Sequence, residues 1–323
     1  MMKGNVSLNL KTYTLFREEL MGVATIMIIL CHIVGNDVLL PPIVLKVLTL
    51  GNYGVDVFMF LSGLGLFYSL RNNFQTNIVW YKKRYIRIFI PYLIMTLFYC
   101  VVRFGVHEFS ILDIILSLST LDFWIYGRGA WYISAILPLY FLTPYLSKLI
   151  ESRKNKFSCT ILIILILIIL SKVSISDNEI LTNIQFVLSR VPMFILGYWL
   201  ARYTKGEICI TIKNAVLLTI LSIIFYVFLN IYTVLAIPIL IALGYFVNWI
   251  DKLYVVDLIL RFMGKISLES YLANIYIPEI IRHINFGDLG IGNYLSYGLV
   301  VIIGIPFAYF INRISFSLIN KIR

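Results

Sequence analysis

Ionisable residues inside long apolar runs are the first residues of this chain that could do chemistry. His32, Asp56, Arg190 and Glu269 lie in such runs or at their edges. A charged side chain at the centre of a bilayer costs at least about 2.5–3.5 kcal/mol, so each one needs a specific reason to be there. These residues are therefore the starting points for a candidate site.

His32 and Asp56 are the candidate catalytic pair. His32 lies about 22 Å beyond Arg17 along one apolar helix, which places it towards the outer leaflet. Asp56 opens the next run from the outer side, so we expect the two side chains at similar depth on adjacent antiparallel helices. An imidazole whose tautomer is fixed by a carboxylate is a general base. The alternative is an interfacial histidine and an acidic helix N-cap favoured by the helix dipole.

Three further positions each have two interpretations. Arg190, beside the helix-breaking Pro192, should pair with a carboxylate, a ligand phosphate or carbonyls that face a cavity. Trp131 and Tyr132 begin an apolar run on the outer side, where they fit either an aromatic belt or stacking on a sugar. Glu269 is either a capping carboxylate or a ligand contact.

A dense cluster of cations lies between the second and third apolar runs. It comprises Arg71, Lys82, Lys83, Arg84 and Arg87. Positive charge concentrates in cytoplasmic loops, where it also contacts lipid phosphates, so topology alone can explain the cluster. The alternative is a site for the phosphates of a ligand.

The composition defines the elements that must position these residues. The chain has 323 residues, of which 60% are hydrophobic and 13% are charged. Ordinary soluble domains are about 45–50% apolar and about 25% charged, so a soluble enzyme and a disordered chain are both excluded. The net charge of +11 does not indicate nucleic acid, because the cations lie between apolar runs. We expect an all-α membrane protein with one domain over residues 1–323.

Apolar runs near 20 residues predict about ten transmembrane helices. They lie at 18–36, 54–70, 86–104, 130–149, 157–173, 183–201, 211–229, 232–249, 266–281 and 292–312. The amphipathic stretches 109–126 and 255–263 are expected at the membrane interface. The break near Asn230 has hardly any loop. Most of the 27 lysines and arginines fall on one side of this arrangement, which predicts that both termini are cytoplasmic.

The four cysteines are far apart, with no spacing to histidine that suggests a metal site or a disulfide framework. No metal is therefore expected. The polar start of the chain lacks the features of a cleaved signal peptide, so we expect the first apolar run to be retained.

The runs also resemble a known family in order and spacing. Leu20 to His32 resembles the opening helix of the acyltransferase-3 family of membrane acyltransferases, and Gly54 to Gly63 is similar to its GVDxFFxxSG block. Weaker agreement follows at Lys83-Arg84 with Arg87, at Trp131-Tyr132, at Arg190 to Phe194, and at Gly264 to Leu272. Two positions differ, because Met21 stands where many members have arginine and Asn274 where many have histidine.

The resemblance implies a bacterial multi-pass enzyme of the cell membrane. It would transfer an acyl group, usually acetyl, from acyl-CoA to a hydroxyl of a cell-envelope carbohydrate. His32 would then be the base, with Asp56 orienting it. Arg71, Lys83, Arg84, Arg87 and Arg190 would bind acyl-CoA, and Trp131, Tyr132 and Glu269 would contact substrate. The residues themselves also fit a proton-coupled carrier or flippase for an envelope precursor, with His32, Asp56 and Arg190 as a relay.

Overall fold

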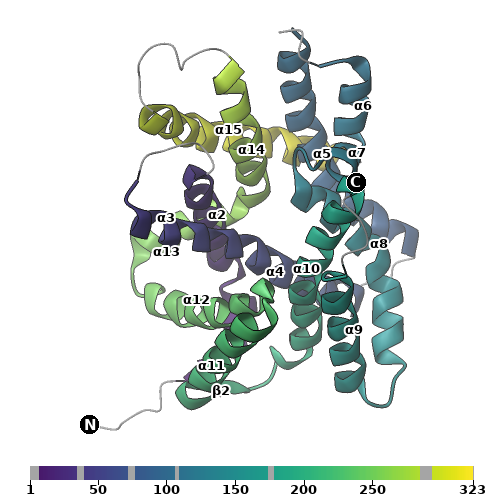
Figure 1. The fold of residues 1–323 in the computed structure, drawn as a ribbon, viewed down its shortest axis with the longest axis vertical. Helices are drawn as coiled ribbons and strands as arrows, with labels where there is room; N and C mark the ends of the chain where they lie inside the picture. Colours follow the sequence, from purple (N-terminus) through teal and green to yellow (C-terminus); the bar gives the residue numbers. More distant parts are fainter. Residues whose placement is uncertain are drawn as a thin grey trace.

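The computed structural model describes residues 7–34, 40–71, 77–105, 109–173, 178–283 and 293–322. The protein is a helical bundle (Figure 1). Each predicted span lies largely within one helix: α2 (Arg17–Val34), α4 (Tyr53–Arg71), α5 (Asn77–Gly105), α8 (Trp131–Glu151), α9 (Lys156–Leu170), α10 (Glu179–Leu200), α11 (Ile212–Leu229), α12 (Ala236–Ile250), α14 (Ser267–His283) and α15 (Asn293–Ile322). Seven helical segments of the described residues are long and apolar enough to cross a membrane. The chain is therefore a polytopic membrane protein, as predicted.

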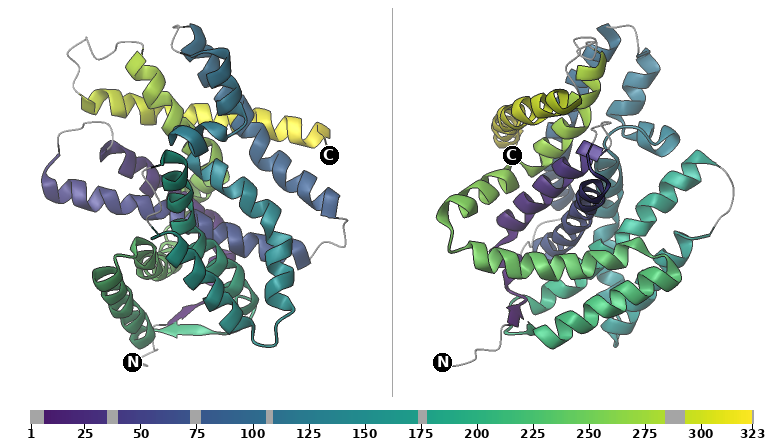
Figure 2. Two further views of the ribbon diagram at one scale, coloured as in Figure 1. Left: turned by 45° about the vertical axis from the view of Figure 1, so that its right-hand side comes forward. Right: turned by 60° about the vertical axis from the view of Figure 1, so that its left-hand side comes forward.

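Shorter elements join and flank these helices. They are α1 (Thr12–Leu15), α3 (Pro42–Thr49), α6 (Ile111–Leu118), α7 (Leu121–Tyr126), α13 (Tyr254–Lys265), and the 3-10 turns η1 (Leu50–Asn52), η2 (Ala201–Tyr203) and η3 (Tyr232–Leu235). Strands β1 (Ser7–Asn9) and β2 (Cys209–Thr211) pair antiparallel near the start of the chain (Figure 2). The two stretches expected at the interface form α6 with α7, and α13. These helices expose apolar side chains, including Ile111, Leu112, Val255 and Leu258.

The helical structure is interrupted at Asn230, between α11 and α12. Asn230 has a φ of 52° and its N–H donates to the carbonyl of Tyr226 at 2.8 Å. Asparagine in the left-handed region is a common way to end a helix. The two adjacent apolar runs are therefore separate helices, as predicted (Figure 2).

Helices α4 and α10 pack face to face at the centre of the bundle. They run parallel, because Asp56 contacts Arg190 near one end and Tyr68 contacts Ala201 near the other. A Cβ added at Gly63 would lie 2.0 Å from the Phe194 carbonyl oxygen, and one at Gly197 would lie 2.0 Å from the Phe60 carbonyl oxygen. Glycine at both positions lets the two backbones touch, as small residues do between membrane helices.

We expect Gly197→Ala to destabilise the protein by about 1–3 kcal/mol, because its Cβ would meet a backbone atom that cannot yield. The measurement is the midpoint of thermal unfolding in detergent. Gly298→Ala is the control, since a Cβ at this position in α15 has no atom within 4 Å. Equal midpoints for the two variants would contradict the close packing of α4 on α10.

Candidate functional site

His32 lies near the end of α2 and contacts α14. Its Nδ1 is 2.7 Å from the side-chain nitrogen of Asn274, which is buried. An amide carries both a donor and an acceptor, so Asn274 can hold either imidazole tautomer according to which end faces the ring. As placed, the amide nitrogen of Asn274 faces Nδ1, which accepts its hydrogen and leaves the imidazole proton on Nε2. With the amide turned over, its oxygen accepts Nδ1–H and Nε2 becomes the nitrogen that takes up a proton. In that arrangement His32 can serve as a general base. Asn274, which positions it, stands where the family resemblance expects histidine.

Asp56 lies deeper in the bundle than the sequence predicts. Helices α3, η1 and α4 form one continuous segment from Pro42 to Arg71, so Asp56 is well inside it rather than at its start. A Cβ at Gly54 would contact the Ala24 carbonyl oxygen of α2. Asp56 is therefore close to the level of Ala24, about 12 Å from His32 along α2. The sequence predicted that Asp56 and His32 would lie at similar depth. In the structure they lie at different levels along α2, so Asp56 does not orient His32 by direct contact.

The partner of Asp56 is Arg190. The Arg190 guanidinium donates to Asp56 Oδ2, and both residues are buried. Asp56 Oδ1 is also buried and has no hydrogen-bond partner among the described residues. A carboxylate was one of the partners predicted for Arg190. The pair holds α4 against α10 within the apolar interior.

Cations line a cavity of about 380 Å³ at the other end of α2. Its walls are Thr14, Arg17, Leu64, Gly65, Tyr68, Arg84, Arg87 and Lys205. The structure thus brings the predicted Arg84 and Arg87 together with Arg17 and Lys205, and none of the lining residues that the structure describes is acidic. We call this the inner cavity, because it lies on the side predicted to be cytoplasmic.

Packing around the inner cavity holds its cations in place. Arg17 lies against α4 where Gly65 has no side chain, since a Cβ there would be 3.5 Å from Arg17 Nη2. Arg17 Nε is buried without a hydrogen-bond partner in the part of the chain that the structure describes. The Lys205 ammonium lies 5.1 Å from the ring centre of Tyr68. Such a cavity can bind a multiply charged anion.

Two other predicted binding residues, Arg71 and Glu269, have partners elsewhere. Arg71 pairs with Glu151 at 3.1 Å, and neither Arg71 nor Lys83 lines the inner cavity. Glu269 accepts a hydrogen bond from Asn312 of α15 at 3.0 Å, which joins α14 to α15. The sequence had left Glu269 between a structural and a ligand contact.

Trp131 and Tyr132 pack into the protein. The Trp131 ring meets the Phe186 ring edge-on, with centroids 4.8 Å apart. Tyr132 is 8% exposed, and its hydroxyl lies 3.0 Å from Ser62 Oγ. Stacking on a sugar needs an open ring face, and the buried Tyr132 ring does not offer one in this structure.

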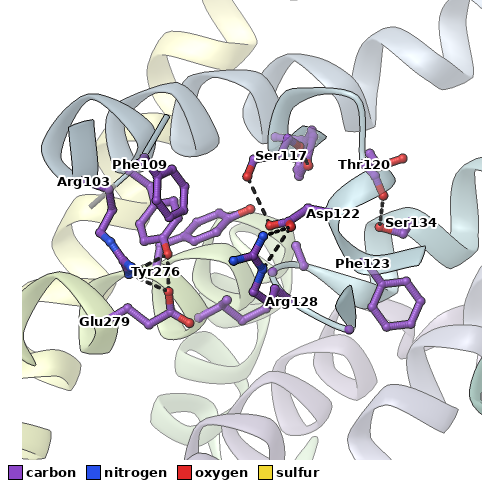
Figure 3. A pocket seen from close by; sticks show the side chains of 16 residues that line it. Arg103, Phe109, Ser117, Thr120, Asp122, Phe123, Arg128, Ser134, Tyr276 and Glu279 are labelled. Carbon is purple, nitrogen blue, oxygen red and sulfur yellow. Dashed lines mark hydrogen bonds and ion pairs between the residues drawn. The ribbon is translucent and has the colours of Figure 1, made fainter. Parts of the chain in front are cut away.

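A second cavity, of about 520 Å³, lies at the opposite end of α5 (Figure 3). It is lined by residues of α5, α6, α7, α8 and α14 and by the 127–130 segment, and we call it the outer cavity. Arg87 and Tyr99 of α5 line the inner and outer cavities respectively, and are about 18 Å apart along the helix. Sequence analysis missed this cavity. The one available signal was the presence of Asp122 within an apolar stretch.

Comparison with protein families gives a match that covers most of these site residues. The family model of the acyltransferase-3 type, described as an acyltransferase domain, matches residues 20–313. The match includes His32, Asp56 and Arg190, whereas Arg17 precedes it. No curated protein and no solved structure matches the chain.

Proposed function

The chain belongs to the acyltransferase-3 family, and from this premise we propose that it transfers an acyl group from acyl-CoA to a hydroxyl of a cell-envelope carbohydrate. The acyl group is proposed to be acetyl, and the location to be the bacterial cell membrane. The observation that carries the proposal is the inner cavity, whose described lining includes four cations and no acid. Coenzyme A carries several phosphates, and arginine forms charge-assisted hydrogen bonds with phosphate.

The acyl group must then travel from the inner cavity to His32. Arg17 and His32 lie on the same helix about 22 Å apart, so an extended pantetheine arm would lie alongside α2. Hydroxyl groups occupy the interior between them. Ser62 Oγ lies 3.0 Å from the Tyr132 hydroxyl, and the Tyr132 N–H donates to the Tyr271 hydroxyl at 3.1 Å. These groups support a polar route through the bundle, since polar side chains of membrane helices mark substrate pathways.

His32 supplies the base in this proposal. Its Nε2 takes the proton of the acceptor hydroxyl as the oxygen attacks the thioester carbonyl. The tetrahedral intermediate collapses as the carbon–sulfur bond breaks, and the proton passes to the leaving thiolate of coenzyme A. Asn274 positions the imidazole, and the Asp56–Arg190 pair holds the helices around it. Neither cavity contains Asp56 or Arg190, so we assign them no contact with the donor.

We expect Arg84→Ala and Arg87→Ala to raise the KM for acetyl-CoA about tenfold, with a smaller fall in kcat. Phosphate contacts far from the reacting carbon stabilise ground state and transition state alike, and a hydrogen bond to a charged group contributes about 1.5–3 kcal/mol. The control is Lys82→Ala, which removes an exposed cation of the same helix that does not line the cavity. An unchanged KM in both variants would mean that Arg84 and Arg87 act only as topology signals and do not bind the donor.

The release of free coenzyme A distinguishes an acyltransferase from a carrier. Purified protein in detergent should hydrolyse acetyl-CoA slowly in the absence of acceptor, because water can replace the hydroxyl. A proton-coupled carrier or flippase would not cleave the thioester, because transport does not require it. Release that equals the rate without protein would therefore favour the carrier.

A further inference from the structure

The outer cavity combines two ion pairs with aromatic rings (Figure 3). Arg128 donates to Asp122 Oδ1 from Nη2 at 2.7 Å and from Nε at 3.1 Å. Arg103 Nη1 lies 3.6 Å from Glu279 Oε2. Among the lining residues that the structure describes, each cation is thus matched by an acid in the same wall. The charged residues in the described lining of the inner cavity, by contrast, are all cations, so the two cavities suit ligands of different charge.

The charge balance favours an uncharged ligand with many hydroxyl groups. A phosphate or a uronate would have to compete with Asp122 and Glu279 for the two arginines. A sugar hydroxyl can donate to a carboxylate and accept from a guanidinium without separating the pair, because it is both donor and acceptor. Hydroxyl groups of Ser117, Thr120 and Ser134 add further polar contacts around the same cavity.

Aromatic rings supply the apolar part of the wall. The rings of Tyr99 and Tyr276 stack with centroids 4.6 Å apart, and Phe109 meets Tyr99 edge-on at 5.5 Å. Polar and apolar groups share the lining about equally, so the cavity is more polar than the usual small-molecule site, which suits a ligand rich in hydroxyl groups. Small-molecule sites span about 300–1,000 Å³. The volume of about 520 Å³ lies within this range.

The chain bends sharply to form the cavity. Thr120, Gly127 and Gly129 all line it and have φ values of 67°, 67° and 79°. A β-branched residue in the left-handed region is rare and must be held by its surroundings. The carbonyl oxygen of Thr120 accepts a hydrogen bond from Ser134 Oγ at 3.3 Å, which ties this turn to α8. The wall is therefore built from fixed backbone.

The outer cavity lies beside His32 on a neighbouring face of α14. Asn274 contacts His32, and the next residue, Ile275, lines the cavity. Successive residues of a helix point about 100° apart, so the two sites are separated by roughly a quarter turn of α14. His32 itself does not line the cavity. One molecule that reaches both sites must therefore extend around this face of the helix.

We propose that the outer cavity binds an uncharged sugar unit of the acceptor glycan, next to the unit whose hydroxyl reaches His32. This inference rests on the proposed transfer to a carbohydrate, and it adds that the acceptor has at least two sugar units. The neighbouring unit would position the reacting hydroxyl without taking part in the bond changes.

Saturation-transfer difference NMR on the purified protein tests the proposal. The probes are methyl glycosides of glucose, N-acetylglucosamine and rhamnose, the disaccharides maltose and chitobiose, and methyl glucuronide as the anionic comparison. We expect at least one neutral saccharide to give signals, and Glu279→Gln and Asp122→Asn each to weaken its affinity about tenfold or more. The two variants lie on different helices, so their agreement would not reflect the failure of one element.

Asp113→Asn is the matched control. Asp113 contacts the same Arg128 at 3.4 Å but does not line the cavity. Hydrogen bonds from Ser110 hold the pKa of Asp113 below its usual range, so this substitution also removes a full negative charge. We expect it to leave saccharide affinity within about twofold of wild type, because an exposed ion pair contributes little.

Two results would overturn the proposal: no neutral saccharide gives a signal above that of the Glu279→Gln and Asp122→Asn variants, or the glucuronide binds better than every neutral probe. Hydrolysis of acetyl-CoA by the wild-type protein is measured in parallel. Hydrolysis of acetyl-CoA above the rate without protein, with no saccharide binding, would reject the sugar-binding inference and leave the proposed acyl transfer standing. Saccharide binding without any hydrolysis would reject the proposed acyl transfer and leave the cavity assignment standing.

Discussion

His32→Ala is expected to lower the rate of acyl transfer by about 10²–10⁴, which is the usual contribution of a general base. The variant should still insert and fold, because a small apolar side chain removes a polar group from the membrane rather than adding one. Binding of acetyl-CoA should persist, since the inner cavity lies at the other end of α2. The measurement is single-turnover transfer with protein amount normalised in the membrane fraction.

Two neighbouring substitutions test whether the loss is specific to the imidazole. Cys31→Ala changes the adjacent residue, whose thiol makes a long contact of 3.8 Å to the Thr49 carbonyl, so near-normal transfer is expected. Asn274→Ala removes the positioning amide and should lose less than His32→Ala, whereas Asn274→Asp keeps an oxygen that can accept Nδ1–H and should restore most of the rate. Full transfer by His32→Ala would remove the histidine from the mechanism.

Asp56→Leu and Arg190→Met are each expected to destabilise the protein by about 3–5 kcal/mol, because each leaves the partner as an unpaired buried charge. The double variant Asp56→Leu with Arg190→Met should be much more stable than the sum of the two losses predicts. Replacing a buried ion pair by apolar residues of similar volume is often neutral. The measurement is a double-mutant cycle of unfolding in detergent.

The outcome of this cycle separates structure from substrate binding. If the pair only holds α4 on α10, the double variant should recover both stability and acyl transfer. Independent and additive losses would contradict a direct contact between the two side chains. A stable double variant without transfer would assign Asp56 or Arg190 to the reaction after all.

Apolar periodicity and length were sufficient to predict the helices, because a membrane helix satisfies its own backbone hydrogen bonds and needs only local sequence to be recognised. The break at Asn230 and the separate helices on either side of it followed from the same pattern. The cluster at Arg84 and Arg87 was also visible, since positive charge between two spans is a local feature. These predictions depend on residues that are close together in the chain.

The site was harder to predict because it depends on how helices align. Asp56 was placed at the start of a span, whereas the continuous helical segment of α3, η1 and α4 begins at Pro42 and carries Asp56 below the level of His32. Nothing in a single sequence indicates that Asn274 would contact His32, or that Glu279 would reach Arg103. The outer cavity needs contacts between α5, α7 and α14, which are far apart in the chain, so its residues could not be grouped in advance.

The most direct test of the proposed reaction uses inverted membrane vesicles, which expose the predicted cytoplasmic face, and acetyl-CoA with an isotope-labelled acetyl group. Mass spectrometry then measures labelled, alkali-labile acetyl esters on the envelope glycan inside the vesicles. We predict labelled glycan with the wild-type protein, and almost none with His32→Ala or in sealed right-side-out vesicles given the same donor. Equal labelling by His32→Ala, or labelling from donor added only to the outer face, would contradict the account.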